Sequence, residues 1–159
     1  MDRVKGAIFS SLGELVPGAR VLDLFAGSGG MGIEALSRGA QSAVFVESND
    51  KCVRCIRENL RRAGVEGSVQ TMDAFRFLDL YAGENAFDLI IADPPYAKLQ
   101  GDPDLAAALV ASEKLAAALQ PGGLFVLEKQ AGGPPAAGPL ELIRSRGYGG
   151  SEIHYFARP

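Results

Sequence analysis

Residues 19–30 of the chain, Ala-Arg-Val-Leu-Asp-Leu-Phe-Ala-Gly-Ser-Gly-Gly, decide its fold. The apolar run 19–25 predicts a buried strand, and the glycines after it predict a tight turn. A short helix is then expected to run to about Arg38 and to end at Gly39. A strand that passes through a glycine-rich turn into a helix is the unit from which parallel α/β sheets are built.

The same alternation continues along the chain. Further strands are expected at 42–46, 68–72, 87–92 and 124–128, with helices over 2–15, 50–63, 74–80 and 104–119. Gly149-Gly150 indicates a hairpin that joins strands at 140–146 and 151–157, although 140–146 could equally form a short helix. We therefore predict a single α/β domain over residues 1–159, a doubly wound Rossmann-like sheet that is mostly parallel, with an antiparallel C-terminal hairpin strand.

Composition excludes several classes of protein. The 159 residues carry a net charge of −3, which argues against broad non-specific binding of nucleic acid but leaves room for a local basic patch. The sequence contains no apolar stretch near the length of a membrane span and no signal peptide, so we expect a cytoplasmic protein. Cys52 and Cys55 lack further ligands nearby, because the only histidine is His154, and we expect ordinary thiols and no metal.

Acidic residues follow the expected strands with unusual regularity. The first four strands end in Asp23, Glu47, Asp73 and Asp93, and Glu128 follows the fifth without an evident role. Carboxyl ends of parallel strands meet at one edge of the sheet, where ligands bind. Because a buried carboxylate needs a partner, several acids at one edge indicate a ligand that is rich in hydrogen-bond donors.

The glycines admit two cofactors. Gly27-x-Gly29-x-x-Gly32, with Glu47 twenty positions after Gly27, fits the dinucleotide pattern of an NAD(P)-binding oxidoreductase. A carboxylate at Asp23, close to the turn, suits a cationic amino group better than a diphosphate. This difference favours S-adenosylmethionine, whose methionine end is cationic.

We assign the cofactor contacts on this basis. Asp23 and the Gly27–Gly29 backbone face the methionine end, Glu47 the ribose hydroxyls, and Asp73 with the Ala74 amide the adenine. Phe25, in the turn itself, is included among the cofactor-binding residues. Asp73 would serve equally well as a helix cap.

Asp93-Pro94-Pro95-Tyr96 is the second informative motif. The acid and the carbonyls of a proline-stiffened turn accept hydrogen bonds from an amino group, and the tyrosine offers a flat face for stacking. A planar ring that bears an amino group describes a nucleobase. Residues 93–96 are therefore the candidate catalytic residues.

These motifs resemble those of class I methyltransferases, whose amino-methylating branch carries D/N-P-P-Y/F. Asp2-Arg3-Val4-Lys5-Gly6-Ala7-Ile8-Phe9 and the stretch 23–40 are similar to the RsmD family of ribosomal RNA guanine-N2 methyltransferases. The resemblance implies methyl transfer from S-adenosylmethionine to guanine N2 in small-subunit (16S) rRNA, as RNA or as an assembling 30S particle. An adenine-N6 DNA methyltransferase shares the tetrapeptide and remains an alternative.

The sequence departs from that family at its start. Members usually carry an upstream basic hairpin and Arg-Pro-Thr before the D-R-V segment, whereas this sequence begins at Met1-Asp2. The resemblance implies that the upstream segment helps to hold RNA. We expect its contribution to be missing from this chain.

Overall fold

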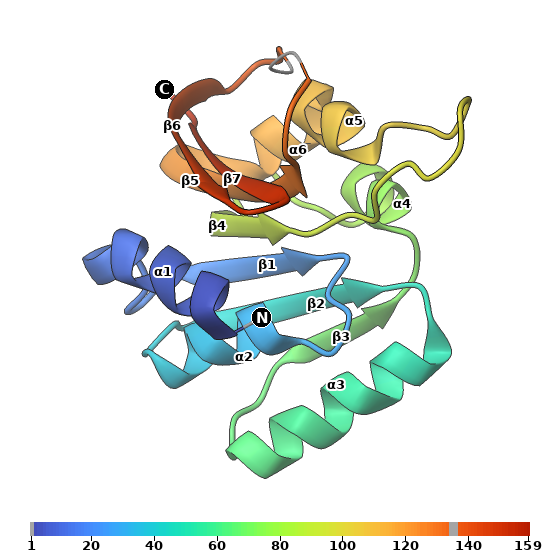
Figure 1. Ribbon diagram of the computed structural model, residues 1–159. Helices are drawn as coiled ribbons and strands as arrows, with labels where there is room; N and C mark the ends of the chain where they lie inside the picture. The colour runs from blue at the N-terminus through green and yellow to red at the C-terminus, as the bar shows by residue number, and fades with distance from the viewer. Residues whose placement is uncertain (1, 134–136) are drawn as a thin grey trace.

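The computed structural model describes residues 2–133 and 137–159, and its strands form one seven-stranded sheet of order β3-β2-β1-β4-β5-β7-β6 (Figure 1). Strands β1 to β5 run parallel to one another, and β7 is antiparallel to both β5 and β6. This arrangement confirms the predicted fold, and the segment that could have been a strand or a short helix is a strand, Glu141–Tyr148. The strands are β1 (Arg20–Leu24), β2 (Ser42–Glu47), β3 (Ser68–Thr71), β4 (Phe87–Ala92), β5 (Leu119–Gln130), β6 (Glu141–Tyr148) and β7 (Ser151–Ala157).

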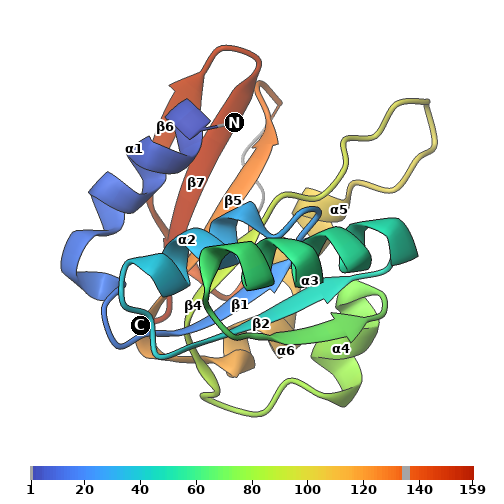
Figure 2. The same ribbon diagram turned by 90° about the horizontal axis from the view of Figure 1, so that it is seen from below.

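Helices cover both faces of the sheet (Figure 2). Alternate residues of each central strand enter different cores: Val21 packs with α1, α2 and α3, whereas Leu22 packs with α4, α5 and α6. This alternation follows from the two-residue period of a strand. The helices are α1 (Asp2–Leu12), α2 (Gly30–Ser37), α3 (Asp50–Ala63), α4 (Ala74–Leu80), α5 (Leu105–Ala111) and α6 (Glu113–Ala118).

Two expected helices differ from the structure. The helix predicted over 104–119 is two helices, because Ser112 adopts an extended backbone and its hydroxyl caps α6 by accepting the Leu115 N–H at 3.0 Å. The first helix ends at Leu12 and continues as a 3₁₀ turn, Gly13–Leu15. Strand β5 also begins earlier than predicted, at Leu119.

Strand register brings the polar rim together. Leu24 pairs with Val46 on one side and with Ala92 on the other, and Ala92 pairs in turn with Leu127. The residues that follow these positions therefore emerge side by side at one edge of the sheet. The carboxyl ends of the strands, predicted to form a common edge, do so in space.

Candidate active site

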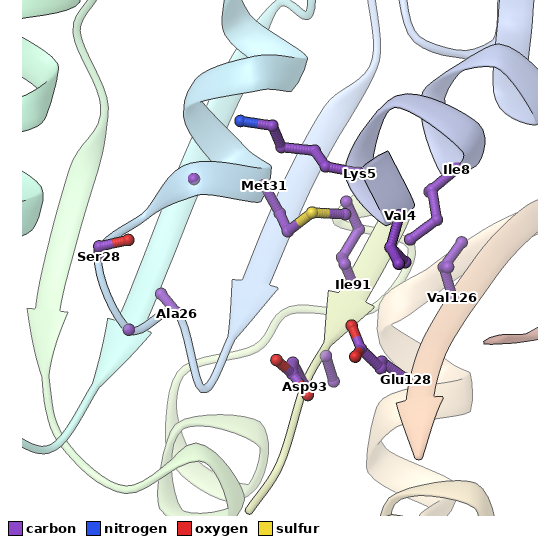
Figure 3. A pocket seen from close by; sticks show the side chains of 13 residues that line it. Val4, Lys5, Ile8, Ala26, Ser28, Met31, Ile91, Asp93, Val126 and Glu128 are labelled. Atoms are coloured by element: carbon purple, nitrogen blue, oxygen red, sulfur yellow. The ribbon is translucent and has the colours of Figure 1, made fainter. Parts of the chain in front are cut away.

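A cavity of about 300 Å³ opens at this edge, between α1, the loop before α2, and the ends of β4 and β5. Val4, Ile8 and Val126 form apolar parts of its wall, and Asp93 and Glu128 lie among its polar residues (Figure 3). The loop supplies Ala26, Gly27 and Ser28.

The glycine loop adopts backbone angles that glycine tolerates better than other residues. Gly27 has φ 59° and Gly29 has φ 84°, in the left-handed region that side chains disfavour. A Cβ added at Gly27 would meet no atom within 4 Å, so the loop leaves open space beside it. Phe25 also has a positive φ, of 54°, and thus holds a strained conformation next to the cavity.

Gly32 is required for packing. A Cβ there would lie 2.4 Å from the Phe45 ring, which shows that α2 approaches β2 too closely for any side chain at this position. The third glycine of the motif therefore brings the start of α2 close to the sheet.

Asp23 is a residue of β1 and lies outside the lining of the cavity. It is 3% exposed, and its Oδ2 accepts the Gly32 N–H at 3.0 Å. Burial raises the pKa of Asp23 to about 8; the Gly32 hydrogen bond opposes the rise, and the charges of Asp93 and Glu47 add to it. The carboxyl group thus holds the first turn of α2, directly after the glycine loop.

The residues predicted for ribose and adenine meet at a second hollow, of about 20 Å³. Phe25, Glu47, Asp73 and Ala74 all line it. Glu47 accepts the N–H groups of Gly27 at 2.9 Å and of Asn49 at 2.8 Å. Its carboxylate therefore connects this hollow to the glycine loop.

Asp73 serves as the helix cap that its position allowed. Its Oδ2 accepts the Arg76 N–H at 3.1 Å at the start of α4. Ala74, the first residue of that helix, is buried at the floor of the hollow. A ligand would meet Asp73 through oxygen lone pairs that the cap leaves open.

Asp93 and Glu128 follow neighbouring positions of β4 and β5 and line the same cavity (Figure 3). The Asp93 side chain is in contact with solvent but is partly surrounded by protein atoms. This partial burial is the larger cause that raises the pKa of Asp93 to about 6, and repulsion by Glu128 is the second cause. Within residues 2–133 and 137–159, neither carboxylate accepts a hydrogen bond from a protein donor.

The loop 94–96 lines another cavity, of about 410 Å³. Pro94 is buried, whereas Tyr96 is 39% exposed. Burial raises the pKa of Tyr96, the charges of Glu128 and Asp93 add to the rise, and a hydrogen bond with the Ser151 side chain opposes it. The four motif residues thus lie between two hollows, with the tyrosine face accessible.

Sequence reasoning missed two residues that position the site. Lys5 extends from α1 along the cavity and lies 3.6 Å from the Glu34 carboxylate (Figure 3). Asn59 of α3 donates to the Ser28 carbonyl at 2.9 Å and so holds the loop from a distant helix. Helical periodicity could not reveal either contact, although Lys5 lies in the segment 2–9 that resembles the family.

Other surface features bear less directly on the site. Arg61 and Arg62 on α3 pair with Glu58, at 2.6 and 3.1 Å. Cys52 and Cys55 are free thiols in the same helix. In the part of the chain that the structure describes, no three metal-capable side chains cluster, and no helix is both long and apolar enough to cross a membrane.

This sheet order, with a glycine loop after β1 and an Asp-Pro-Pro-Tyr loop after β4, defines a Rossmann-like methyltransferase. Comparison with known proteins agrees. The model of the family described as "Conserved hypothetical protein 95" matches residues 1–157. The chain belongs to this family, the RsmD family of class I methyltransferases.

Relatives and solved structures support the assignment. YlbH of Bacillus subtilis, whose name provisionally makes it an rRNA methyltransferase, is 37% identical over 153 residues, 93% of this chain and 80% of that protein. Ribosomal RNA small subunit methyltransferase D of Haemophilus influenzae is 33% identical over 98 residues, 60% of this chain. The match spans 51% of that relative's length.

Solved structures show the same architecture. A conserved hypothetical protein of Streptococcus pyogenes superposes with a TM-score of 0.81 at 37% identity, over 98% of this chain and 95% of its own. An RNA methyltransferase of Salinibacter ruber in complex with S-adenosyl-L-homocysteine shares the fold, with a TM-score of 0.75 at 19% identity, over 100% of this chain and 92% of its own.

Proposed function

We propose that this protein transfers a methyl group from S-adenosylmethionine to guanine N2 in small-subunit ribosomal RNA. The relatives named as rRNA methyltransferases support the substrate class. The observation that carries the proposal is the position of Asp93, a carboxylate beside the glycine loop that accepts no hydrogen bond from residues 2–133 and 137–159. The enzyme would act in the cytoplasm, as one domain, on RNA or on an assembling 30S particle.

The residues of the site fit S-adenosylmethionine. The open space at Gly27 leaves room for a ligand at the backbone of the loop, and the adjacent hollow joins Phe25, Glu47, Asp73 and Ala74. We assign the methionine end to the loop 27–29 and to Asp23, which holds the start of the following helix, and the adenosine end to the hollow. Lys5, the cation of α1 in the cavity wall, suits the methionine carboxylate.

The bound cofactor supplies an electrophilic methyl carbon on a positively charged sulfur. The protein has to position the nucleophile. An exocyclic amine conjugated with a purine is a poor nucleophile, and hydrogen bonds from its N–H groups to Asp93 and the Pro94 carbonyl would reduce that conjugation. Such positioning supplies a large part of a rate enhancement. The proton that the nitrogen loses can pass to the Asp93 carboxylate, whose raised pKa suits a proton acceptor.

Tyr96 completes the site as a stacking surface. Its ring is partly exposed at the end of the proline-stiffened loop. A base that is unpaired, or turned out of a helix, can lie against such a ring while its edge reaches Asp93.

A methyl-acceptor assay tests the proposal. Small ribosomal subunits and rRNA from cells that lack the protein, together with DNA, are offered with labelled S-adenosylmethionine, and the modified nucleoside is identified by mass spectrometry. We expect N2-methylguanosine in small-subunit rRNA. N6-methyladenine in DNA would support the alternative methyltransferase, and binding of NADH in place of S-adenosylhomocysteine would support an oxidoreductase.

Asp93→Ala tests the catalytic assignment. The variant should lose at least about 100-fold in methyl transfer, because positioning and proton acceptance are both lost. Its affinity for S-adenosylhomocysteine should stay within about twofold, since the loop that we assign to the cofactor is untouched. Full activity in this variant would remove Asp93 from the mechanism.

A further inference from the structure

Glu128 is a second carboxylate at the place where the base would meet Asp93. Ala92 and Leu127 are register partners in β4 and β5, so the next residue of each strand, Asp93 and Glu128, emerges at adjacent positions. Neighbouring strands lie about 4.8 Å apart. Both side chains reach the same cavity (Figure 3).

The five acids of the rim differ in what they contact. Asp23, Glu47 and Asp73 each accept backbone N–H groups, at distances between 2.8 and 3.1 Å. In the described part of the chain, by contrast, no donor bonds to Asp93 or Glu128. Among the described residues, three of the five acids therefore accept backbone N–H groups, whereas Asp93 and Glu128 face the cavity without a hydrogen-bond donor.

Two carboxylates at adjacent positions repel each other. Burial is the larger cause of the raised pKa of Asp93, and repulsion by Glu128 is the second. Hydrogen-bond donors on a ligand would offset the free-energy cost of holding two such carboxylates side by side. The matching ligand presents two neighbouring donors. The bases differ in this property: guanine carries N–H donors at both N1 and N2, whereas adenine carries a donor at N6 and a bare acceptor at N1.

We propose that Glu128 determines the choice of base: it accepts the guanine N1–H while Asp93 and the Pro94 carbonyl hold the N2 amino group. This inference rests on the proposed function and adds to it a residue that reads the base. With adenine, the lone pair of N1 would face the Glu128 carboxylate, and an acceptor would oppose an acceptor. A site that is built around a donor can reject an analogue lacking it by about 10⁴-fold.

The test compares Glu128→Gln with wild-type protein and with Glu141→Gln. The amide has nearly the same shape as the carboxylate, lacks its charge, and can donate to an adenine N1 through its NH2 group. The substitution therefore weakens the preference for guanine without leaving a gap. Glu141 is exposed on β6, away from the cavity, and serves as the matched control. Circular dichroism and an unfolding curve establish that each variant is folded.

The substrates are small ribosomal subunits from cells that lack the protein. One set carries the natural rRNA, in which mass spectrometry has located the methylated nucleotide. The other carries adenine at that nucleotide, introduced through a plasmid-borne rRNA gene. Methyl transfer is measured under single-turnover conditions, with S-adenosylhomocysteine affinity measured in parallel.

Wild type and Glu141→Gln should methylate the guanine subunits alone. Glu128→Gln should lose at least about 30-fold on guanine, and its adenine-to-guanine ratio should rise at least about tenfold, with cofactor affinity unchanged. An unaltered guanine rate, an unaltered ratio, or a loss explained by weaker cofactor binding would each overturn the inference. If wild-type protein methylates neither set, the proposed function itself has failed; if it forms N2-methylguanosine and Glu128→Gln behaves like wild type, only the role of Glu128 is wrong.

Discussion

The pH–rate profile of methyl transfer should have an acidic limb that is caused by protonation of Asp93. The ionised carboxylate accepts hydrogen bonds from the amine and can take up the proton that the amine loses, whereas the protonated form is a weaker acceptor and cannot take up that proton. With a pKa of about 6, Asp93 is about half ionised at pH 6 and about one-tenth ionised at pH 5. The active form exists above this pKa and is lost as pH falls through it, so the rate should drop about tenfold for each pH unit below 6.

The pH–rate profile of Glu128→Gln is the second measurement. Removing the Glu128 charge removes one cause of the raised pKa, whereas burial, the larger cause, remains. The limb should therefore move to lower pH without reaching the ordinary value of 3.8. Because Asp23 also titrates nearby, with a pKa of about 8, Asp23→Asn is measured too and should keep the limb near 6.

The assay is single-turnover methyl transfer between pH 4.5 and 8 at saturating cofactor, with circular dichroism at each pH to exclude unfolding. A wild-type limb near pH 4 would show that Asp93 behaves as an ordinary surface acid. A limb that Glu128→Gln leaves in place would show that the two carboxylates are not coupled. Either result would refute the reasoning.

Three further substitutions test other parts of the site. Gly32→Ala should lower the free energy of unfolding by about 1–3 kcal/mol in urea titrations, because the new Cβ would overlap the Phe45 ring; an unchanged midpoint would contradict the close approach of α2. Asp23→Asn should gain stability relative to wild type as pH rises from 4 to 8, since the unfolded wild-type chain ionises Asp23 above its ordinary pKa of 3.8 while the folded protein keeps the proton up to about pH 8; melting temperatures of both proteins that run parallel with pH would contradict this. Tyr96→Ala should weaken kcat/KM for RNA by about 10- to 100-fold through lost stacking, while Tyr96→Phe keeps most activity; equal activity of the two variants would exclude stacking.

Strand and turn patterns predicted most of the architecture correctly. The two-residue alternation of the strands and the glycine-rich turn are local signals, and β4, α3, α4 and β7 have the bounds that the sequence indicated. The helix break at Ser112 escaped prediction because an alanine-rich stretch favours a continuous helix. The capping role of the serine inside this stretch depends on an extended backbone at Ser112, which the sequence pattern does not indicate.

For the candidate site, the sequence correctly located the acids at the rim but not their contacts. Asp23, Glu47 and Asp73 look alike in the sequence, as acids at strand ends. In the structure, Asp23 holds the first turn of α2, Glu47 holds Gly27 and Asn49, and Asp73 caps a helix. Their direct contacts with a cofactor remain predictions.

The sequence by itself determined the order of strands and helices, the glycine loop, and the acid-proline-proline-tyrosine turn, because periodicity and turn chemistry act over a few residues. Only the tertiary structure decided which acids accept backbone N–H groups and which line the cavity without a hydrogen-bond donor among the described residues. Asp93 and Glu128 lie far apart in the sequence and become neighbours only through the register of β4 and β5. That register is fixed because the alternating side chains of both strands pack into two separate cores. No local sequence pattern specifies which residues of the two strands become partners.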